Sequence, residues 1–192
     1  MVKDLIIKNR SYRGYDESCS LTRDQLMNYV DGARFCASSI NMQPLKYFVA
    51  CENADVEKIQ KCVRWARRLP GITLPHPGMY PTAYLVICQD RNIFDNLNRF
   101  TMDIGIAAQS MLLMAAEEGL GGCMIRNFDP EEIRKALDLP AYLQPMLVIA
   151  LGRPAETIVL TEMGEDGETA YYRDENDVHY VPKRSLEELL IN

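Results

Sequence analysis

The sequence predicts an α+β fold in which a sheet of short strands is surrounded by helices. Three observations lead to this: apolar runs of strand length, capping signals that mark helix starts, and one long apolar stretch with helical periodicity. The chain has 192 residues, of which 47% are hydrophobic and 25% charged, which suits one globular domain with a sizeable core. We therefore expect a single domain over residues 1–192.

Helix starts are marked at three places. A capping box at Thr22–Gln25 precedes apolar residues at helical spacing. Asp129 precedes Pro130, and proline is favoured at the first helical position. The segment Ser185–Glu188 repeats the capping box near the C-terminus. These signals predict helices that begin at each of the three positions.

Short apolar runs separated by helical stretches predict the strands. The runs are Tyr47–Cys51, Ala83–Cys88, Gly122–Ile125 and Met146–Leu151. The polar, glycine-containing stretch Glu162–Asp177 predicts a loop or hairpin, and His179 follows it as a strand residue.

The stretch from Ile93 to Glu118 contains a helix that is apolar on most of its faces. Ile104, Met111 and Leu112 belong to one stripe, and further apolar residues fill the other faces. A helix that is apolar all round must be buried. It is either the centre of the core, or the centre of a dimer interface, or both, and we favour both.

Charge and hydropathy narrow the class of partner. The formal net charge of −6 and the pI near 5.0 give no basic footprint for nucleic acid or an anionic membrane surface. No apolar run is long enough to cross a bilayer, and charged residues interrupt Met1–Arg10, so that segment lacks the apolar core of a signal peptide. We expect a cytoplasmic protein whose partner is a small molecule or another protein.

The cysteines have no C-x-x-C pair and no histidine at metal-ligand spacing. This pattern fits reduced thiols in a reducing compartment and predicts neither a disulfide framework nor a metal site. The cysteines are Cys19, Cys36, Cys51, Cys62, Cys88 and Cys123.

The first candidate binding cluster is the segment Asn9–Arg13. Arg10 and Arg13 flank the hydroxyl of Ser11, and guanidinium groups match phosphate oxygens in geometry and charge. Charge-assisted hydrogen bonds of this kind contribute roughly 1.5–3 kcal/mol each. The alternative is a solvated basic turn.

The second cluster is the polar loop Ala37–Pro44, between the helix that begins near Thr22 and the strand at Tyr47. Its serine, asparagine and glutamine side chains could bind a ring with imide and carbonyl edges. Alternatively, these side chains cap their own backbone in a loop that ends a helix.

The third cluster joins Asp103–Gln109 to Glu118–Ile125. Its glycines end a helix and turn directly into a strand, which allows main-chain N–H groups to approach a ligand closely. A tight helix-to-strand turn without a ligand explains the same residues.

The order of these clusters resembles that of the FMN-dependent nitroreductase family, over most of the chain. The matching motifs are Arg10-Ser11-x-Arg13, Ser38-Ser39-x-Asn41-x-Gln43-Pro44, Asp103-x-Gly105-x-Ala107-x-Gln109, Gly119-Leu120-Gly121, Leu151-Gly152-Arg153-Pro154 and Pro182-Lys183-Arg184. The resemblance implies an FMN-binding α+β sandwich, with a central, mainly antiparallel sheet flanked by helices. It also implies an interlocked homodimer with an FMN in each interface cleft. The C-terminal segment 155–192 would then wrap the partner.

The resemblance also implies which residues bind the FMN phosphate. Arg10 and Ser11 would hold it, and Arg13 would reach the phosphate or the pyrimidine edge of the ring. Lys183 and Arg184 would complete the grip.

The remaining roles concern the flavin ring. Four polar residues would come from the other subunit, and four more would lie along the ring, where the main-chain N–H of Arg126 would point at flavin N5. The first set is Ser38, Ser39 and Asn41, with Gln43 near the polar edge; the second is Met124, Ile125, Arg126 and Asn127.

Three departures from the family pattern bear on these roles. Asn9 stands where family members often have an arginine, so one phosphate contact is in doubt. Leu45 replaces a tryptophan common after the Gln-Pro pair. The segment before Ala83 is short, and Arg64, Arg67 or Arg68 could contact the ring or the nicotinamide phosphate.

The implied activity is ping-pong hydride transfer through flavin N5, from NADH or NADPH to a nitroaromatic, a quinone or a similar electron-poor small molecule. The cofactor does the chemistry, so no catalytic side chain is required. Two other interpretations remain open. One is an FMN enzyme with different chemistry, namely flavin breakdown, dehalogenation or dehydrogenation, and the other is a flavin-free interaction protein.

Overall fold

A computed structural model describes residues 1–66, 69 and 71–192 of the chain. Arg67 and Arg68 lie outside the described residues. In chain order the elements are α1 (Val2–Lys8), β1 (Tyr15–Asp16), α2 (Arg23–Ala33), a 3₁₀ turn η1 (Ser39–Asn41), β2 (Leu45–Ala50), α3 (Asn53–Cys62), β3 (Ala83–Asp90), α4 (Thr101–Glu117), β4 (Gly121–Ile125), α5 (Pro130–Ala136), β5 (Leu143–Pro154), β6 (Ile158–Glu162), β7 (Tyr172–Arg173), β8 (His179–Lys183) and α6 (Leu186–Leu189).

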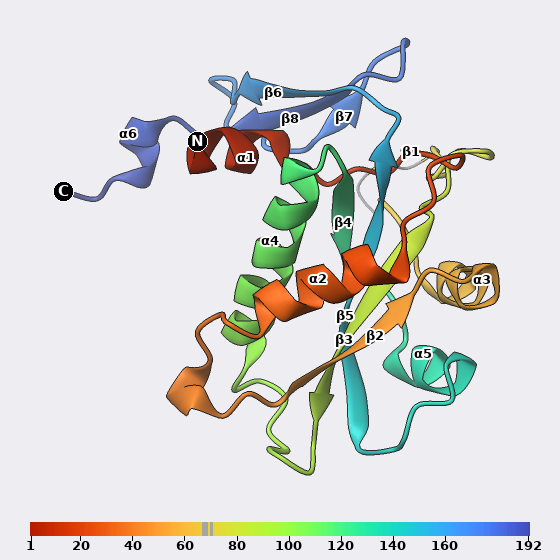
Figure 1. Cartoon of the computed structure of the whole chain (residues 1–192). Coiled ribbons are helices and arrows are strands. Elements are labelled where there is room, and N and C mark those ends of the chain that lie inside the picture. Colours follow the sequence, from red (N-terminus) through yellow and green to blue (C-terminus); the bar gives the residue numbers. More distant parts are fainter. Residues whose placement is uncertain (67–68, 70) are drawn as a thin grey trace.

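The long strand β5 is the centre of the main sheet (Figure 1). It pairs antiparallel with β3 on one side, and with β4 and the short β1 on the other. Strand β2 pairs antiparallel with the far side of β3. All four pairings in this sheet are therefore antiparallel, and the strands predicted from apolar runs are all present in it.

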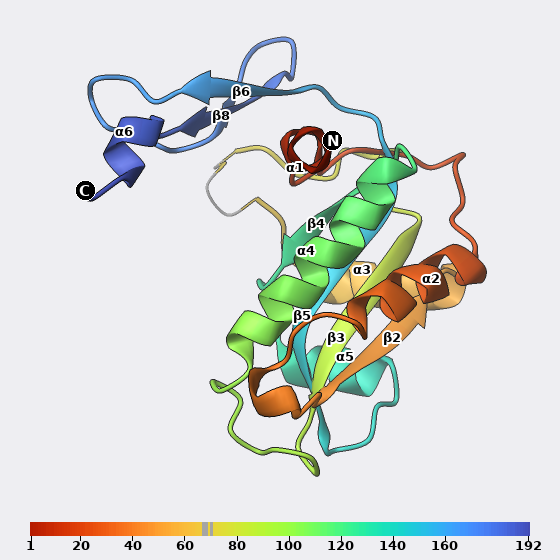
Figure 2. The same ribbon diagram turned by 60° about the vertical axis from the view of Figure 1, so that its left-hand side comes forward.

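Helices cover both faces of the main sheet, as Figures 1 and 2 show. On one face, Leu85 and Ile87 of β3 belong to the same hydrophobic cluster as residues of α2 and α4. On the other face, Tyr84 and Val86 belong to a cluster that includes residues of α3 and α5. The alternation follows from the two-residue period of a strand. It confirms the predicted α+β sandwich.

The three predicted capping signals form as expected. Thr22 and Gln25 bond reciprocally at the start of α2, and the Asp129 side chain accepts from the Glu131 main-chain N–H at the start of α5. The Ser185 side chain accepts from the Glu188 main-chain N–H at the start of α6. Each cap satisfies main-chain N–H groups that a helix leaves without an internal partner.

Helix α4 begins at Thr101, well after Ile93. The residues before it form turns in which the side chain of Asn96 accepts from the main-chain N–H of Asn98. One face of α4 packs in the core, but Met102 and Ile106 on another face are 73% and 43% exposed. The helix is therefore a core element in this chain, and its exposed apolar face is free to pack against something else.

The C-terminal part of the chain forms a second, smaller sheet in which β6 pairs parallel with β8 and β7 pairs antiparallel with β8. This sheet lies beside α1, near the N-terminus of the same chain (Figure 2). Beyond it, α6 extends away from the rest of the chain (Figures 1 and 2). The predicted hairpin at Glu162–Asp177 thus contains β7, whose partner β8 follows directly.

Candidate functional site

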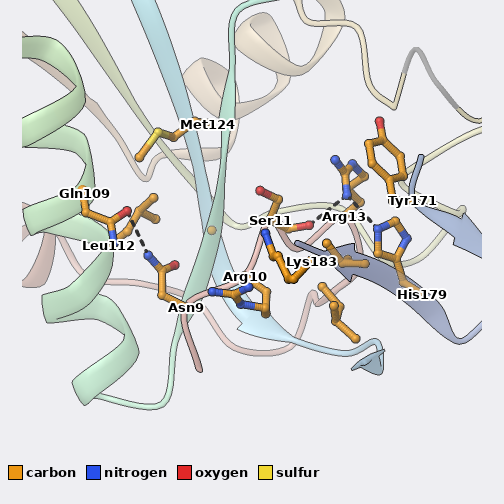
Figure 3. A pocket seen from close by; sticks show the side chains of 13 residues that line it. Asn9, Arg10, Ser11, Arg13, Gln109, Leu112, Met124, Tyr171, His179 and Lys183 are labelled. Carbon is orange, nitrogen blue, oxygen red and sulfur yellow. Dashed lines mark hydrogen bonds between the residues drawn. The ribbon is translucent and has the colours of Figure 1, made fainter. Parts of the chain in front are cut away.

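A pocket of about 350 Å³ lies between the N-terminal segment, α4 and the second sheet. Figure 3 shows Asn9, Gln109 and Leu112 on the α4 side, and Arg13, Tyr171 and His179 on the opposite side. We call it the anion pocket, because its lining includes three cationic side chains and a hydroxyl. These are Arg10, Ser11, Arg13 and Lys183.

Close packing against β4 positions the N-terminal side of the anion pocket. Ser11 forms a bridge with Gly122, and the Tyr12 main-chain N–H donates to the Gly122 carbonyl at 3.1 Å. A Cβ at Gly121 would lie 2.5 Å from the Tyr12 ring, so a side chain there would displace the segment. The glycines after α4 therefore allow the N-terminal segment to pack closely on β4.

The Arg13 guanidinium is fixed by neighbours on several sides. Its Nη1 donates to the Ser11 carbonyl at 3.0 Å and lies 3.5 Å from His179 Nε2 (Figure 3). The guanidinium carbon lies 4.8 Å from the centre of the Tyr171 ring, in a cation–π contact. Arg13 is thereby ordered before any ligand arrives, which lowers the entropy cost of binding.

Arg10 brings an unsatisfied donor to the anion pocket. Its Nη2 donates to the Ile6 carbonyl at 2.6 Å, but its buried Nε has no hydrogen-bond partner in the described part of the chain. Burial lowers the pKa of Arg10, because desolvation disfavours the cation. A buried donor without a partner is costly, so an anion that accepts from Nε would relieve that cost.

Asn9 takes part in the anion pocket as a neutral residue. Its side chain is 9% exposed and its Nδ2 lies 3.4 Å from Gln109 Oε1 on α4. Asn9 occupies the position at which the resemblance leads us to expect an arginine. The pocket keeps its other cations, so the doubt raised by Asn9 concerns one contact and not the site.

His179 is a pocket residue for which the sequence predicted only a strand position. It is 1% exposed, and burial together with Arg13 and Arg173 lowers its pKa to about 4. The imidazole is therefore neutral at pH 7, and Nε2 is free to accept from Arg13 if Nδ1 carries the proton. A lone histidine in a tail gives no sequence signal of this contact, because the contact depends on how the second sheet packs.

A second cleft, of about 380 Å³, shares one lining residue with the anion pocket. Met124 lines both, and the second cleft also includes Arg126 and the first turns of α4. Gly105 lines it too, and a Cβ there would meet nothing within 4 Å. We call it the ring cleft. The two hollows are therefore neighbours at Met124, and the anion pocket is cationic whereas the ring cleft is more apolar.

The polar loop at residues 38–43 lies elsewhere, at the N-terminal end of α4 (Figure 1). Ser38 Oγ and the Ser39 main-chain N–H both donate to the buried carboxylate of Asp103, at 2.7 and 3.0 Å. Ser38 and Gln43 line a separate pocket of about 240 Å³. Asp103 and Gln109, the nearer of the two α4 residues that line the anion pocket, are six positions apart, or about 9 Å along the helix axis. None of residues 38–43 lines the anion pocket of its own chain.

The backbone of this loop is strained. Ile40, Asn41 and Gln43 have φ values of 51°, 53° and 52°. This left-handed region is unfavourable for residues other than glycine, most of all for a β-branched one. Such strain persists only where surrounding contacts hold it, and it is concentrated at functional sites. Here Ser38 Oγ accepts from the Gln43 main-chain N–H at 3.0 Å, and the Gln43 side chain donates to Asn41, while Asp103 holds Ser38.

Other residues predicted for the site lie outside the two hollows. The Ile125 side chain is buried in the cluster beneath α3 and α5, and the Asn127 carbonyl accepts from the Arg64 main-chain N–H at 2.8 Å. Arg64 Nη1 donates to the Lys61 carbonyl. Arg184 forms an exposed ion pair with Glu188 at 3.1 Å and does not line the anion pocket.

All six cysteines lie among the described residues and are free thiols. Within residues 1–66, 69 and 71–192, no cluster of three or more His, Cys, Asp or Glu side chains is placed to hold a metal ion. None of the described helices is long and apolar enough to cross a membrane.

Comparison with known proteins gives a consistent result. A family model described as the nitroreductase family matches residues 6–73 and 76–153. A protein of Methanothermobacter thermautotrophicus, provisionally named an NADH dehydrogenase/NAD(P)H nitroreductase, is 26% identical over 161 residues, which cover 81% of this chain and 78% of that protein.

Solved structures share the fold. A nitroreductase family protein from Clostridium novyi NT has a TM-score of 0.65 at 19% identity, with 98% of each chain covered. A protein from Exiguobacterium sibiricum 255-15, provisionally named a nitroreductase and solved in complex with FMN, has a TM-score of 0.66 at 13% identity, with 81% of this chain and 89% of that chain covered. The family match extends over about three quarters of the sequence. The chain belongs to the nitroreductase family.

Proposed function

We propose that this nitroreductase-family oxidoreductase uses FMN to transfer electrons from NADH or NADPH to electron-poor small molecules such as nitroaromatics and quinones. The observation that supports it most is that a cationic pocket and the more apolar ring cleft are neighbours at Met124. FMN has the same two parts, a phosphate and a flat ring. A structural relative solved in complex with FMN supports the same cofactor.

The residues present fit a phosphate at the cationic end. Arg10 and Lys183 supply charge, Ser11 supplies a hydroxyl, and the buried Arg10 Nε lacks a partner among the described residues. Arg13 adds a guanidinium that its neighbours already hold in place. These donors would bind a phosphate monoester through charge-assisted hydrogen bonds.

The ring cleft fits a flat ligand. Met124 and Ile104 give it apolar surface, and the missing side chain at Gly105 leaves room beside α4. We propose that β4 and the residues after it lie along the ring, with the main-chain N–H of Arg126 directed at its reactive edge.

When bound, FMN supplies the redox chemistry by accepting a hydride from the nicotinamide and passing electrons to the acceptor. The chain's own residues bind and orient. Arg10, Arg13 and Lys183 would neutralise the phosphate and fix its position. His179 is neutral above about pH 4 and adds no further charge beside Arg13.

We further propose that the working unit is a homodimer in which the polar loop at residues 38–43 completes the partner's site. Large apolar side chains are exposed around this loop and on α4: Phe35 at 71%, Ile40 at 67%, Met102 at 73% and Ile106 at 43%. An exposed apolar patch of this kind is typical of a protein–protein interface. It would bring the loop to a second copy.

The C-terminal segment 155–192 was expected to wrap the partner, and we keep this proposal for its last part. Residues Ile158–Lys183 pack on their own chain, whereas α6 and the residues after it extend away and expose apolar side chains (Figure 2). These are Leu186, Leu189, Leu190 and Ile191. The six free thiols are consistent with a cytoplasmic location.

An absorbance spectrum of the purified protein tests the function. We expect the bands of oxidised flavin, which bleach when NADH or NADPH is added without oxygen. The nicotinamide that bleaches them faster is the preferred donor. Flavin bands that neither nicotinamide bleaches would favour an FMN enzyme with different chemistry. A colourless protein that takes up no added FMN would refute the proposal.

A further inference from the structure

The anion pocket is assembled from two segments that are far apart in the sequence. The N-terminal segment contributes Arg10, Ser11 and Arg13, and β8 in the second sheet contributes His179 and Lys183. A ligand that touches both sides therefore depends on how firmly the second sheet is docked on the N-terminal segment.

Glu156 joins these two segments. It lies between β5 and β6, and its side chain is 3% exposed. One carboxylate oxygen accepts the main-chain N–H of Arg13, and the other pairs with Nη2 of Arg173 on β7. Beside it, the Ala155 main-chain N–H donates to the Gly14 carbonyl at 3.0 Å. Glu156 thus bonds both to the chain that carries the phosphate-binding residues and to the second sheet.

Arg173 pairs with a second carboxylate besides Glu156, while its buried Nε has no hydrogen-bond partner among the described residues. The Arg173 side chain is 2% exposed, and its Nη1 also pairs with Asp177 at 2.8 Å. Asp177 in turn lies 3.1 Å from His76 Nε2, in the loop before β3. The charge of Arg173 is thus more than balanced by two carboxylates. Arg173 does not line the anion pocket, whose cations are Arg10, Arg13 and Lys183.

We propose that Glu156 is a positioning residue for the cofactor phosphate: it docks the second sheet on the N-terminal segment, so that a phosphate monoester is gripped from both sides. The inference rests on the proposed function. Because a phosphate held by both segments would also pull them together, binding and docking favour each other by the same factor. A ligand without the phosphate makes no such bridge, although it can still occupy the ring cleft.

Comparing FMN with riboflavin, which lacks the phosphate, tests this inference in the full-length protein. Glu156→Gln keeps an oxygen that can accept from Arg13 but removes the charge opposite Arg173. We expect it to weaken FMN binding about tenfold and to change riboflavin binding less than about twofold, which is within the usual range of coupling between sites. Fluorescence titration measures both dissociation constants.

A matched control is Asp16→Asn. Asp16 of β1 pairs with Arg153 of β5 at 3.6 Å, at an exposed position. Arg153 lies three residues before Glu156 in the sequence. We expect its FMN-to-riboflavin affinity ratio to equal that of the unmodified protein. An equal loss of both ligands in Glu156→Gln, or no loss of either, would overturn the positioning role. Unmodified protein that binds neither flavin would refute the proposed function itself, and the inference with it.

A second measurement needs no variant. It tests whether the phosphate stabilises the docking of the second sheet, even if Glu156→Gln does not fold. Hydrogen exchange reports local opening of the second sheet. In the unmodified protein we expect FMN to slow exchange in residues 158–183 more than saturating riboflavin does. Equal protection by the two flavins would overturn the inference.

Discussion

Two polar clusters lie near α4, and they differ in how complete they are. The anion pocket faces the middle of the helix, and one chain supplies both of its sides. The polar loop at residues 38–43 lies at the start of the helix, where Asp103 holds it in a strained conformation. One cluster is a cavity ready for a ligand, whereas the other is a set of ordered donors beside an exposed apolar patch.

The difference suggests that the two clusters have different roles. A charged ligand must be enclosed on several sides, so its binding residues come from segments that pack together within one chain. The polar loop instead binds Asp103 of its own chain, and an exposed apolar patch lies around it. The proposed homodimer would use this loop to complete the partner's site.

The largest effect is expected on the cavity side, from Arg13→Ala. It removes a guanidinium that Ser11, His179 and Tyr171 hold in place, and charge-assisted contacts contribute roughly 1.5–3 kcal/mol each, so FMN should bind about 10- to 100-fold more weakly. Flavin content and titration measure this. Arg91→Ala, which removes an exposed ion pair with Asp95, is the control. Unchanged flavin content in Arg13→Ala would remove Arg13 from the site.

A smaller effect should separate two neighbouring cations at the end of β8. Lys183 lines the anion pocket, whereas Arg184 pairs with Glu188 at the surface. We expect Lys183→Ala to weaken FMN binding about tenfold and Arg184→Ala to change it less than about twofold. Equal losses would mean that Arg184 turns into the pocket once a ligand is bound.

Mixed dimers test whether the loop completes the partner's site. Arg13→Ala damages the pocket, and Ser38→Ala combined with Asn41→Ala damages the loop. If pocket and loop meet across a two-fold interface, co-expression of the two variants restores one intact site per mixed dimer, or about a quarter of all sites. Flavin content of separately tagged dimers shows this. No restoration would place the loop outside the partner's site.

The smallest effect concerns pH and His179. Its pKa is about 4 in the folded chain and near 6.5 when unfolded, so between these values only the unfolded chain binds the proton. Stability therefore falls as pH decreases through this window, by at most about 1.4 kcal/mol per pH unit from this group. His179→Phe should show a smaller difference between pH 7 and pH 5 in urea unfolding. If the free energy of unfolding fell by the same amount between pH 7 and pH 5 in both proteins, His179 would not be a buried neutral histidine.

The sequence predicted best what is decided locally. The capping boxes at Thr22–Gln25 and Ser185–Glu188 form because both partners lie within one turn of a helix. The strands were visible because β3 and β5 are buried on both faces and read as apolar runs. Helix α1 was not predicted, because it spans only seven residues and none of them is buried.

The site was predictable in part for the same reason. Arg10, Ser11 and Arg13 are close in sequence, so their shared chemistry was visible. The contact of Glu156 with Arg173 could not be predicted from the sequence, because it depends on the parallel pairing of β6 with β8 across a polar stretch. His179 and Tyr171 reach Arg13 only through that pairing.

Helix α4 also sets a fixed distance between the polar loop and the anion pocket. Asp103 fixes the loop at one point on it, and Gln109 and Leu112 meet the anion pocket further along. Each residue inserted or deleted between them would shift the two by about 1.5 Å and turn one against the other by about 100°. Evolution can therefore exchange side chains on the exposed face of this segment more readily than it can change the number of residues in it.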